Sequence, residues 1–101
     1  MKIIYMLCAL GMSSSFTVKK LSEGLLKRGI QAKITARSEA EVEDYVQEAD
    51  LILVAPQAAY MKDEIQKLCD QHGKKMAVLS PKLYGSLDSE KLAEFVIPFL
   101  E

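Results

Sequence analysis

One of the two cysteines stands where an apolar segment changes into a short string of small and polar residues. Cys8 follows the apolar residues 3–7 and precedes residues 9–15. If a buried strand ends at Cys8 and a helix begins a few residues later, free backbone N–H groups favour the thiolate and can bind an anion. Phosphoryl transfer needs mainly such positioning and charge stabilisation. The spacing therefore indicates a phosphocysteine site.

The residue types after Cys8 suit a phosphate-binding loop. Gly11 lets the backbone turn its N–H groups inward, and three successive serines offer hydroxyl donors. The candidate phosphate-binding residues are Ala9, Leu10, Gly11, Met12, Ser13, Ser14 and Ser15. A lone cysteine at a strand end is also commonly a small buried hydrophobe. The residue types alone leave both interpretations of Cys8 open.

The absence of an arginine after Cys8 helps to distinguish phosphate hydrolysis from phosphoryl transfer. A low-molecular-weight phosphatase or arsenate reductase needs C-x-x-x-x-x-R, in which the arginine forms bidentate bonds to the phosphoryl oxygens. Ser14 occupies the arginine position here. This favours a carrier that passes its phosphoryl group on, with a hydrolase or reductase and a noncatalytic flavodoxin-like module as the alternatives.

Composition and charge restrict the partners and the compartment. The 101 residues suit one domain spanning 1–101, and 14 acidic against 13 basic residues argue against nucleic acid. No apolar segment reaches the ~18 residues of a membrane span, so direct membrane insertion is not expected. Cys8, Cys69 and His72 form neither a disulfide framework nor a metal-ligand motif. We expect a reducing, cytoplasmic location, with neither metal nor cofactor.

Apolar periodicity divides the chain into alternating strands and helices. Strands are predicted at 3–7, 31–36, 51–55 and 75–79, and helices from 13 to 29, after a capping box at 38–41, from 58 to 72 and after Asp88. The residues predicted to face inward from the helices are Phe16, Val18, Leu21, Leu25, Val42, Tyr45, Val46, Ala49, Ala58, Met61, Ile65, Leu68, Cys69, Leu92, Phe95, Val96, Phe99 and Leu100.

This alternation predicts an α/β fold of one domain. Short connections imply four parallel strands with right-handed crossovers, in the order 2-1-3-4, and helices on both faces. The architecture is the three-layer sandwich of phosphatase-like and flavodoxin-like proteins. Ligands bind such sheets beyond the carboxyl ends of the strands, so the loops 8–15, 55–60 and 80–85 are expected to converge there.

Three motifs in register resemble one known family. They are Cys-Ala-Leu-Gly-Met-Ser-Ser-Ser at 8–15, Ala-Pro-Gln at 55–57 with Tyr60 and Met61 after it, and Leu-Tyr-Gly at 83–85. Together they resemble the lactose/cellobiose-type enzyme IIB component of the bacterial sugar phosphotransferase system, over essentially the whole chain. One departure is Ser80, where many members carry an acidic residue.

The resemblance implies a phosphotransferase component with Cys8 as the catalytic phosphocysteine. Cys8 would take phosphate from a phosphohistidine of the IIA partner and pass it to a sugar bound by the membrane transporter IIC. The sugar would be a β-linked disaccharide such as cellobiose, chitobiose or lactose. Residues 9–15 would bind the phosphate, and Pro56, Gln57, Tyr60 and Tyr84 would lie around them.

Other residues receive structural or docking interpretations. Met12 and Phe16 form an apolar pair beside the loop that is a candidate docking surface for IIA or IIC, with core packing as the alternative. Cys69 is expected to be structural, and His72 suits the end of a helix. The sugar site belongs to the transporter in this family, so the sequence names neither the sugar nor the oligomeric state.

Overall fold

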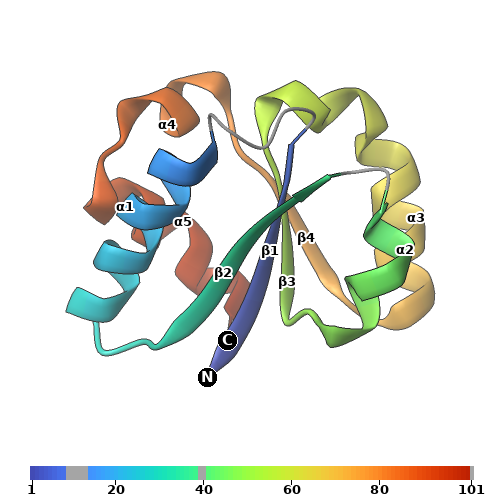
Figure 1. Ribbon diagram of the computed structural model, residues 1–101, viewed down its shortest axis with the longest axis horizontal. Coiled ribbons are helices and arrows are strands. Elements are labelled where there is room, and N and C mark those ends of the chain that lie inside the picture. The colour runs from blue at the N-terminus through green and yellow to red at the C-terminus, as the bar shows by residue number, and fades with distance from the viewer. Residues whose placement is uncertain (9–13, 39–40, 101) are drawn as a thin grey trace.

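Four parallel strands form the central sheet of the computed structural model, which describes residues 1–8, 14–38 and 41–100 (Figure 1). They are β1 (Lys2–Cys8), β2 (Ala32–Ser38), β3 (Leu51–Val54) and β4 (Lys75–Val78). The order β2-β1-β3-β4 confirms the predicted topology. β1 pairs with both neighbours, so that Cys8 lies opposite Ser38 and Leu7 opposite Val54.

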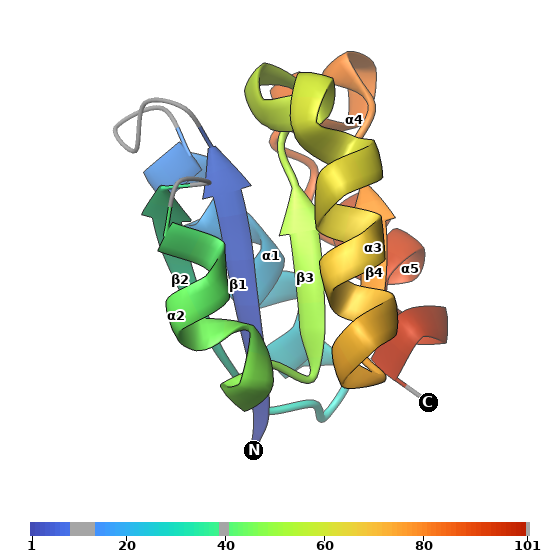
Figure 2. The ribbon, with the colours of Figure 1, turned by 90° about the vertical axis from the view of Figure 1, so that its right-hand side faces the viewer.

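Helices cover both faces of this sheet (Figure 2). One face carries the helices α1 (Ser14–Lys27), α4 (Pro81–Ser86) and α5 (Ser89–Leu100). The other carries α2 (Val42–Tyr45) and α3 (Lys62–His72), with the 3₁₀ helices η2 (Val46–Glu48) and η3 (Pro56–Met61). The predicted three-layer α/β architecture is therefore confirmed.

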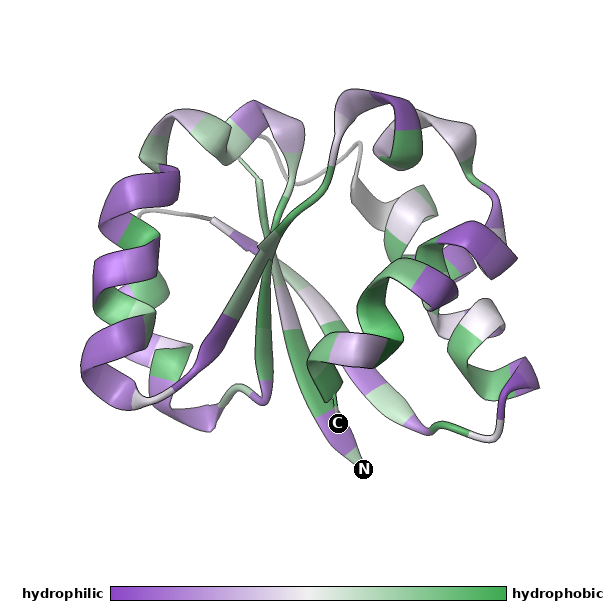
Figure 3. Ribbon diagram, turned by 180° about the vertical axis from the view of Figure 1, so that it is seen from behind, coloured by the Kyte–Doolittle hydropathy of each residue, from purple (hydrophilic) through white to green (hydrophobic). Residues whose placement is uncertain are grey.

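The central strands are hydrophobic because both of their faces are covered. Side chains alternate between the faces of a strand. In β1, Met6 joins the core beneath α1 and α5, whereas Leu7 joins the core beneath α2 and α3. Every residue of β3 is buried. Figure 3 shows the resulting pattern, with hydrophobic colour on the strands and much hydrophilic colour on the surrounding helices.

The predicted inward residues of the helices are largely confirmed, with one clear error in α1. Leu21 and Leu25 are buried as expected, but Phe16 is 67% exposed. Thr17 is buried in its place, at 1% exposure. The buried face of α1 therefore passes through positions 17, 21, 24 and 25. Apolar periodicity predicted a buried phenylalanine, whereas the rotation of the helix places its side chain at the surface.

The start of α2 differs from the prediction. The capping box was expected at 38–41, but Ser38 ends β2 and α2 begins only at Val42, with Glu41 as an N-cap that makes no side-chain cap bond. The Glu41 carboxylate instead accepts a hydrogen bond from Arg37 at 3.1 Å. Glu39 and Ala40, the middle of the predicted box, lie outside the described residues.

Helix α4 was missed, because residues 80–85 were predicted to be a loop. Ser80 is its N-cap, and the Ser80 hydroxyl accepts a hydrogen bond from the Leu83 amide at 3.1 Å. Pro81 occupies the first helical turn, where its missing N–H costs nothing. By contrast, the predicted cap of the last helix is confirmed, because Asp88 accepts hydrogen bonds from the amides of Glu90 and Lys91.

A close backbone approach holds α1 against α5. A Cβ atom added to Gly24 would lie 2.0 Å from the carbonyl oxygen of Ser89, at the start of α5. Only glycine leaves room for this contact, since the obstacle is backbone and cannot rotate away. The packing of α1, and with it the position of the helix that follows Cys8, depends on this residue.

We expect Gly24→Ala to destabilise the fold by about 3 kcal/mol, because two backbones would have to separate. Gly85→Ala is the matched control, since its Cβ would meet nothing within 4 Å and its φ is not positive. Alanine in α4 should stabilise by about 0.5 kcal/mol. Urea unfolding measures both, and equal stability of the two variants would contradict the role given to Gly24.

Candidate functional site

Cys8 lies at the carboxyl edge of the sheet, as the last residue of β1. The residue is buried, at 1% exposure. Since Leu7 points toward α2 and α3, the alternation of the strand directs the Cys8 side chain toward the face that α1 covers. The predicted strand end at the thiol is confirmed.

The helix after Cys8 presents a terminus suited to an anion. Helix α1 begins at Ser14, followed by Ser15, and carries no acidic residue in its first turn. The α2, α3 and α5 helices each have at least one acidic residue there. The N–H groups that open α1 therefore keep their positive partial charge free of a nearby side-chain carboxylate in that turn. The predicted loop residues Ala9, Leu10, Gly11, Met12 and Ser13 lie outside the described residues.

The second predicted loop lies directly beside the cysteine. The amide of Ala55 donates a hydrogen bond to the carbonyl of Leu7 at 2.9 Å, which places the start of η3 next to the end of β1. Pro56 is the first residue of η3, and Gln57 is exposed. Tyr60 is also exposed, at 74%. The carboxyl ends of β1 and β3 are thus side by side, as predicted, whereas residues 9–13 of the first loop lie outside the described residues.

The third predicted segment reaches the site through α1 rather than through the sheet. Its strand, β4, is separated from β1 by β3. However, the Thr17 hydroxyl donates a hydrogen bond to the carbonyl of Tyr84 at 3.3 Å, joining α4 to the first part of α1. The Tyr84 side chain is half-buried against the core beneath α1 and α5. Thr17 was missed by the sequence analysis, although its spacing from Leu21 and Leu25 places it on the buried face.

Neither of the two arginines in the chain replaces the arginine of a phosphatase loop. Arg28 pairs with Glu94 at 3.0 Å, near the far end of α1. Arg37 pairs with Glu41 and lies 4.9 Å above the ring of Tyr45, on the α2 face of the sheet. The Cys8 thiol is directed to the opposite face, so a bidentate guanidinium clamp at the thiol is not supplied from elsewhere in the fold.

The second cysteine has a different environment. Cys69 is fully buried in the core beneath α2 and α3. Burial, together with the neighbouring Asp70 carboxylate, raises the pKa of the Cys69 thiol to about 11. A thiol that stays protonated at neutral pH is a poor nucleophile. His72 is exposed in the last turn of α3, followed by Gly73 as the C-cap, which agrees with the structural interpretation of both residues.

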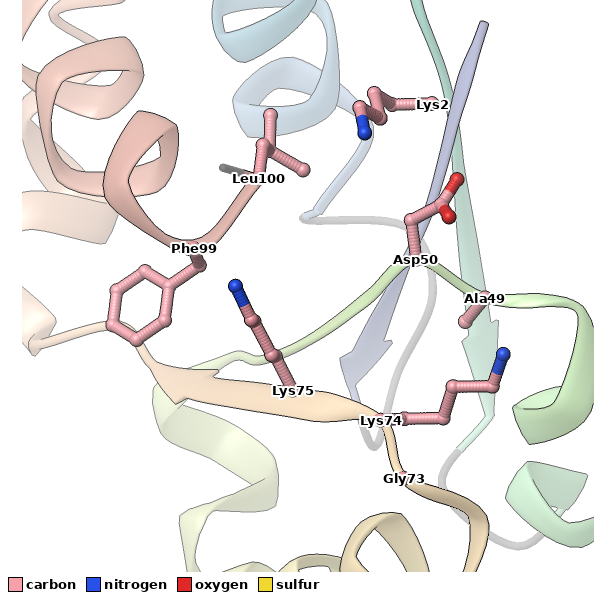
Figure 4. Close-up of a pocket in the computed structure, with 8 residues that line it drawn as sticks. All are labelled: Lys2, Ala49, Asp50, Gly73, Lys74, Lys75, Phe99 and Leu100. Atoms are coloured by element: carbon pink, nitrogen blue, oxygen red, sulfur yellow. The ribbon is translucent and has the colours of Figure 1, made fainter.

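A cavity of about 250 Å³ lies at the opposite edge of the sheet from Cys8 (Figure 4). Residues from the amino ends of β1, β3 and β4 contribute to it, among them Lys2, Asp50 and Lys75. It therefore adds nothing to the thiol site. Within the described ranges there is no group of three or more metal-ligating side chains, and no helix has the length and apolar character to cross a membrane.

Comparison with known proteins gives a consistent result. The family model of the lactose/cellobiose-specific IIB subunit of the phosphotransferase system matches residues 3–95. The oligo-β-mannoside-specific EIIB component of Bacillus subtilis is 34% identical over 93% of this chain and 91% of its own length. A lactose-specific EIICB component of Lacticaseibacillus casei is 24% identical over 97% of this chain, but over only 17% of its own length.

A solved structure shows the same fold. The lactose-specific IIB domain of Streptococcus pneumoniae superposes with a TM-score of 0.89, covering 99% of this chain and 98% of that domain, at 20% identity. The likeness therefore extends from the first strand to the last helix, including the order of the strands.

We expect the high pKa of Cys69 to make the fold less stable at alkaline pH. Its folded pKa of about 11 lies above the ordinary thiol value of 9.0, so its contribution is complete below pH 9 and is lost as the pH rises through 11. The loss should be on the order of 2 kcal/mol. Unfolding free energies of wild-type protein and Cys69→Ala, measured from pH 8 to 11, should converge by that amount, and parallel curves would contradict it.

Proposed function

The chain belongs to the lactose/cellobiose-specific IIB subunits of the phosphotransferase system, and on that premise we propose that Cys8 carries a phosphoryl group between two partner proteins. The donor is a phosphohistidine of a IIA protein. The acceptor is a sugar held by a membrane IIC protein. Residues 1–101 act as one IIB unit in this scheme.

The transfer consists of two displacements at phosphorus. The Cys8 thiolate attacks the phosphorus of the phosphohistidine, so that an S–P bond forms while the N–P bond breaks and the imidazole leaves. A sugar hydroxyl then attacks the same phosphorus and loses its proton. The new O–P bond replaces the S–P bond, and the thiolate is restored. No water enters either step.

The N-terminus of α1 is the observation that carries the proposal. A thiol at the end of β1, ahead of a helix whose first turn has no acidic residue, meets a positive partial charge that favours both the thiolate and the phosphoryl dianion. A phosphatase would add an arginine to drive hydrolysis, and neither Arg28 nor Arg37 supports that role. Transfer to another acceptor therefore fits better than hydrolysis.

The partners and the sugar class follow from the relatives. The EIICB relative joins a IIB region to a longer polypeptide, which supports a IIC partner at the membrane. The oligo-β-mannoside-specific relative supports a β-linked sugar as the final acceptor. We place the chain in the cytoplasm, where its two cysteines stay reduced. Residues 9–15 act as the phosphate-binding loop, with Pro56, Gln57, Tyr60 and Tyr84 around it.

Ser80 fits this scheme despite replacing an acidic residue found in many members. Its hydroxyl caps α4, a role that serine and aspartate both fill well. A neutral side chain at this edge also adds no negative charge near the phosphoryl group.

The central test follows ³²P from phosphorylated IIA to this chain. Wild-type protein should take up one labile phosphoryl group, and Cys8→Ser should take up none. Cys69→Ala is the matched control and should be labelled like the wild type, because Cys69 is buried on the other face of the sheet. Labelled Cys8→Ser protein, or steady hydrolysis of an aryl phosphate by the wild type, would refute the proposal.

A second test concerns docking of the donor. Phe16 lies in the first turn of α1 and is 67% exposed, so a partner approaching the thiol would cover it. We expect Phe16→Ala to raise the KM for phosphorylated IIA about tenfold with little change in kcat, since truncating a buried interface aromatic costs over 1 kcal/mol. Leu26→Ala is the control, because Leu26 is 63% exposed near the other end of α1. Equal KM values for both variants would mean that IIA docks on a surface that does not include Phe16.

A further inference from the structure

Thr17 is a polar residue with a buried side chain, at 1% exposure. Its hydroxyl donates to the carbonyl of Tyr84 at 3.3 Å. That carbonyl lies near the end of α4, where carbonyl groups have no partner within the helix. The preceding carbonyl, of Leu83, is satisfied locally by the Ser86 hydroxyl at 2.8 Å. The end of α4 is thus completed partly by its own residues and partly by α1.

The contact at Thr17 is accompanied by a close backbone approach between α1 and the start of α5. Seven residues later on α1, Gly24 lies so close to the carbonyl of Ser89 that an added Cβ atom would clash with it. Positions seven apart lie two turns apart, about 10 Å, on the same face of a helix. Gly24 therefore fixes α1 to the start of α5, and Thr17 fixes the end of α4 beside the start of α1.

The position of Thr17 gives this contact a functional meaning. Thr17 is the fourth residue of α1, the first helix after Cys8 in the chain. Tyr84 belongs to the third segment, whose strand β4 has no pairing with β1. The Thr17 hydrogen bond therefore ties this third segment to the helix that would hold the phosphoryl group.

We propose that Thr17 is a positioning residue for phosphoryl transfer. Its hydroxyl holds the Tyr84 carbonyl of α4 against the first part of α1, and so fixes the third segment relative to the helix that follows Cys8. This inference rests on the function proposed for Cys8, although Thr17 itself touches neither the thiol nor the phosphoryl group in that role. Packing of the Thr17 methyl group does not replace this hydrogen bond, because only the hydroxyl can donate to the Tyr84 carbonyl.

The test compares two substitutions of similar size. Thr17→Val keeps the shape and removes the hydrogen bond, whereas Thr17→Ser keeps the hydroxyl and removes a methyl group. We expect Thr17→Val to lower kcat for transfer from phosphorylated IIA about tenfold with an unchanged KM. Thr17→Ser should stay within about threefold of the wild type, since a factor of ten corresponds to one hydrogen bond of about 1.4 kcal/mol.

A control variant separates positioning from stability. Val46 is fully buried on the other face of the sheet, so Val46→Ala destabilises the fold without changing the contact between α1 and α4. Thermal melts establish that each variant is folded. If Val46→Ala slows transfer as much as Thr17→Val, Thr17 acts through stability alone and the proposal is wrong.

An NMR measurement reports the hydrogen bond directly. The amide nitrogen of Gly85 follows the Tyr84 carbonyl, so loss of the Thr17 bond should shift its ¹⁵N resonance in Thr17→Val and leave it near the wild-type value in Thr17→Ser. Unchanged kcat in a shifted Thr17→Val protein would overturn the role of Thr17 alone. A wild-type protein that takes no label at Cys8 would instead overturn the proposed function, and this inference with it.

Discussion

The pairing of β1 with strands on both sides is the constraint on which the site depends. Residues 2–8 of β1 pair with β2, and Ile4 to Leu7 also pair with β3. The ladder continues past the strands, because the Ala55 amide bonds to Leu7 and the Leu79 amide bonds to Val54. Pairing on both sides fixes the end of this central strand, and therefore the position of the thiol there. Its neighbouring segments are placed by backbone bonds that do not depend on side-chain identity.

Helix packing completes what the sheet begins. The strands bring the segments after β1 and β3 together, but the segment after β4 is one strand farther away. It reaches the start of α1 because the chain turns into α4, whose Tyr84 carbonyl meets Thr17. The close approach of Gly24 to Ser89 holds α1 against α5 in the same layer, two turns farther along α1. Backbone hydrogen bonds therefore position the segments after β1 and β3, and helix contacts position the segment after β4.

Much of this arrangement was predictable because it follows from local patterns. Continuous apolar segments identified β1 and β3, and Asp88 identified the start of α5. The errors arose where several local signals compete. Phe16 was placed in the core because it is apolar, whereas the rotation of α1 buries Thr17. Ser80 and Pro81 are a helix start, but six residues of α4 are too few for helical periodicity to show.

The position of the two cysteines has a consequence for oxidation. The Cys8 thiol is directed toward the α1 face at the carboxyl edge of the sheet, whereas Cys69 is buried under the other face, in the last part of α3. A disulfide needs Cα atoms within about 7 Å of each other, and here the sheet stands between the two sulfur atoms. The folded chain therefore has no internal thiol with which Cys8 can form a bridge. Oxidation of Cys8 to a disulfide therefore requires a second molecule, because the second cysteine of the same chain is out of reach.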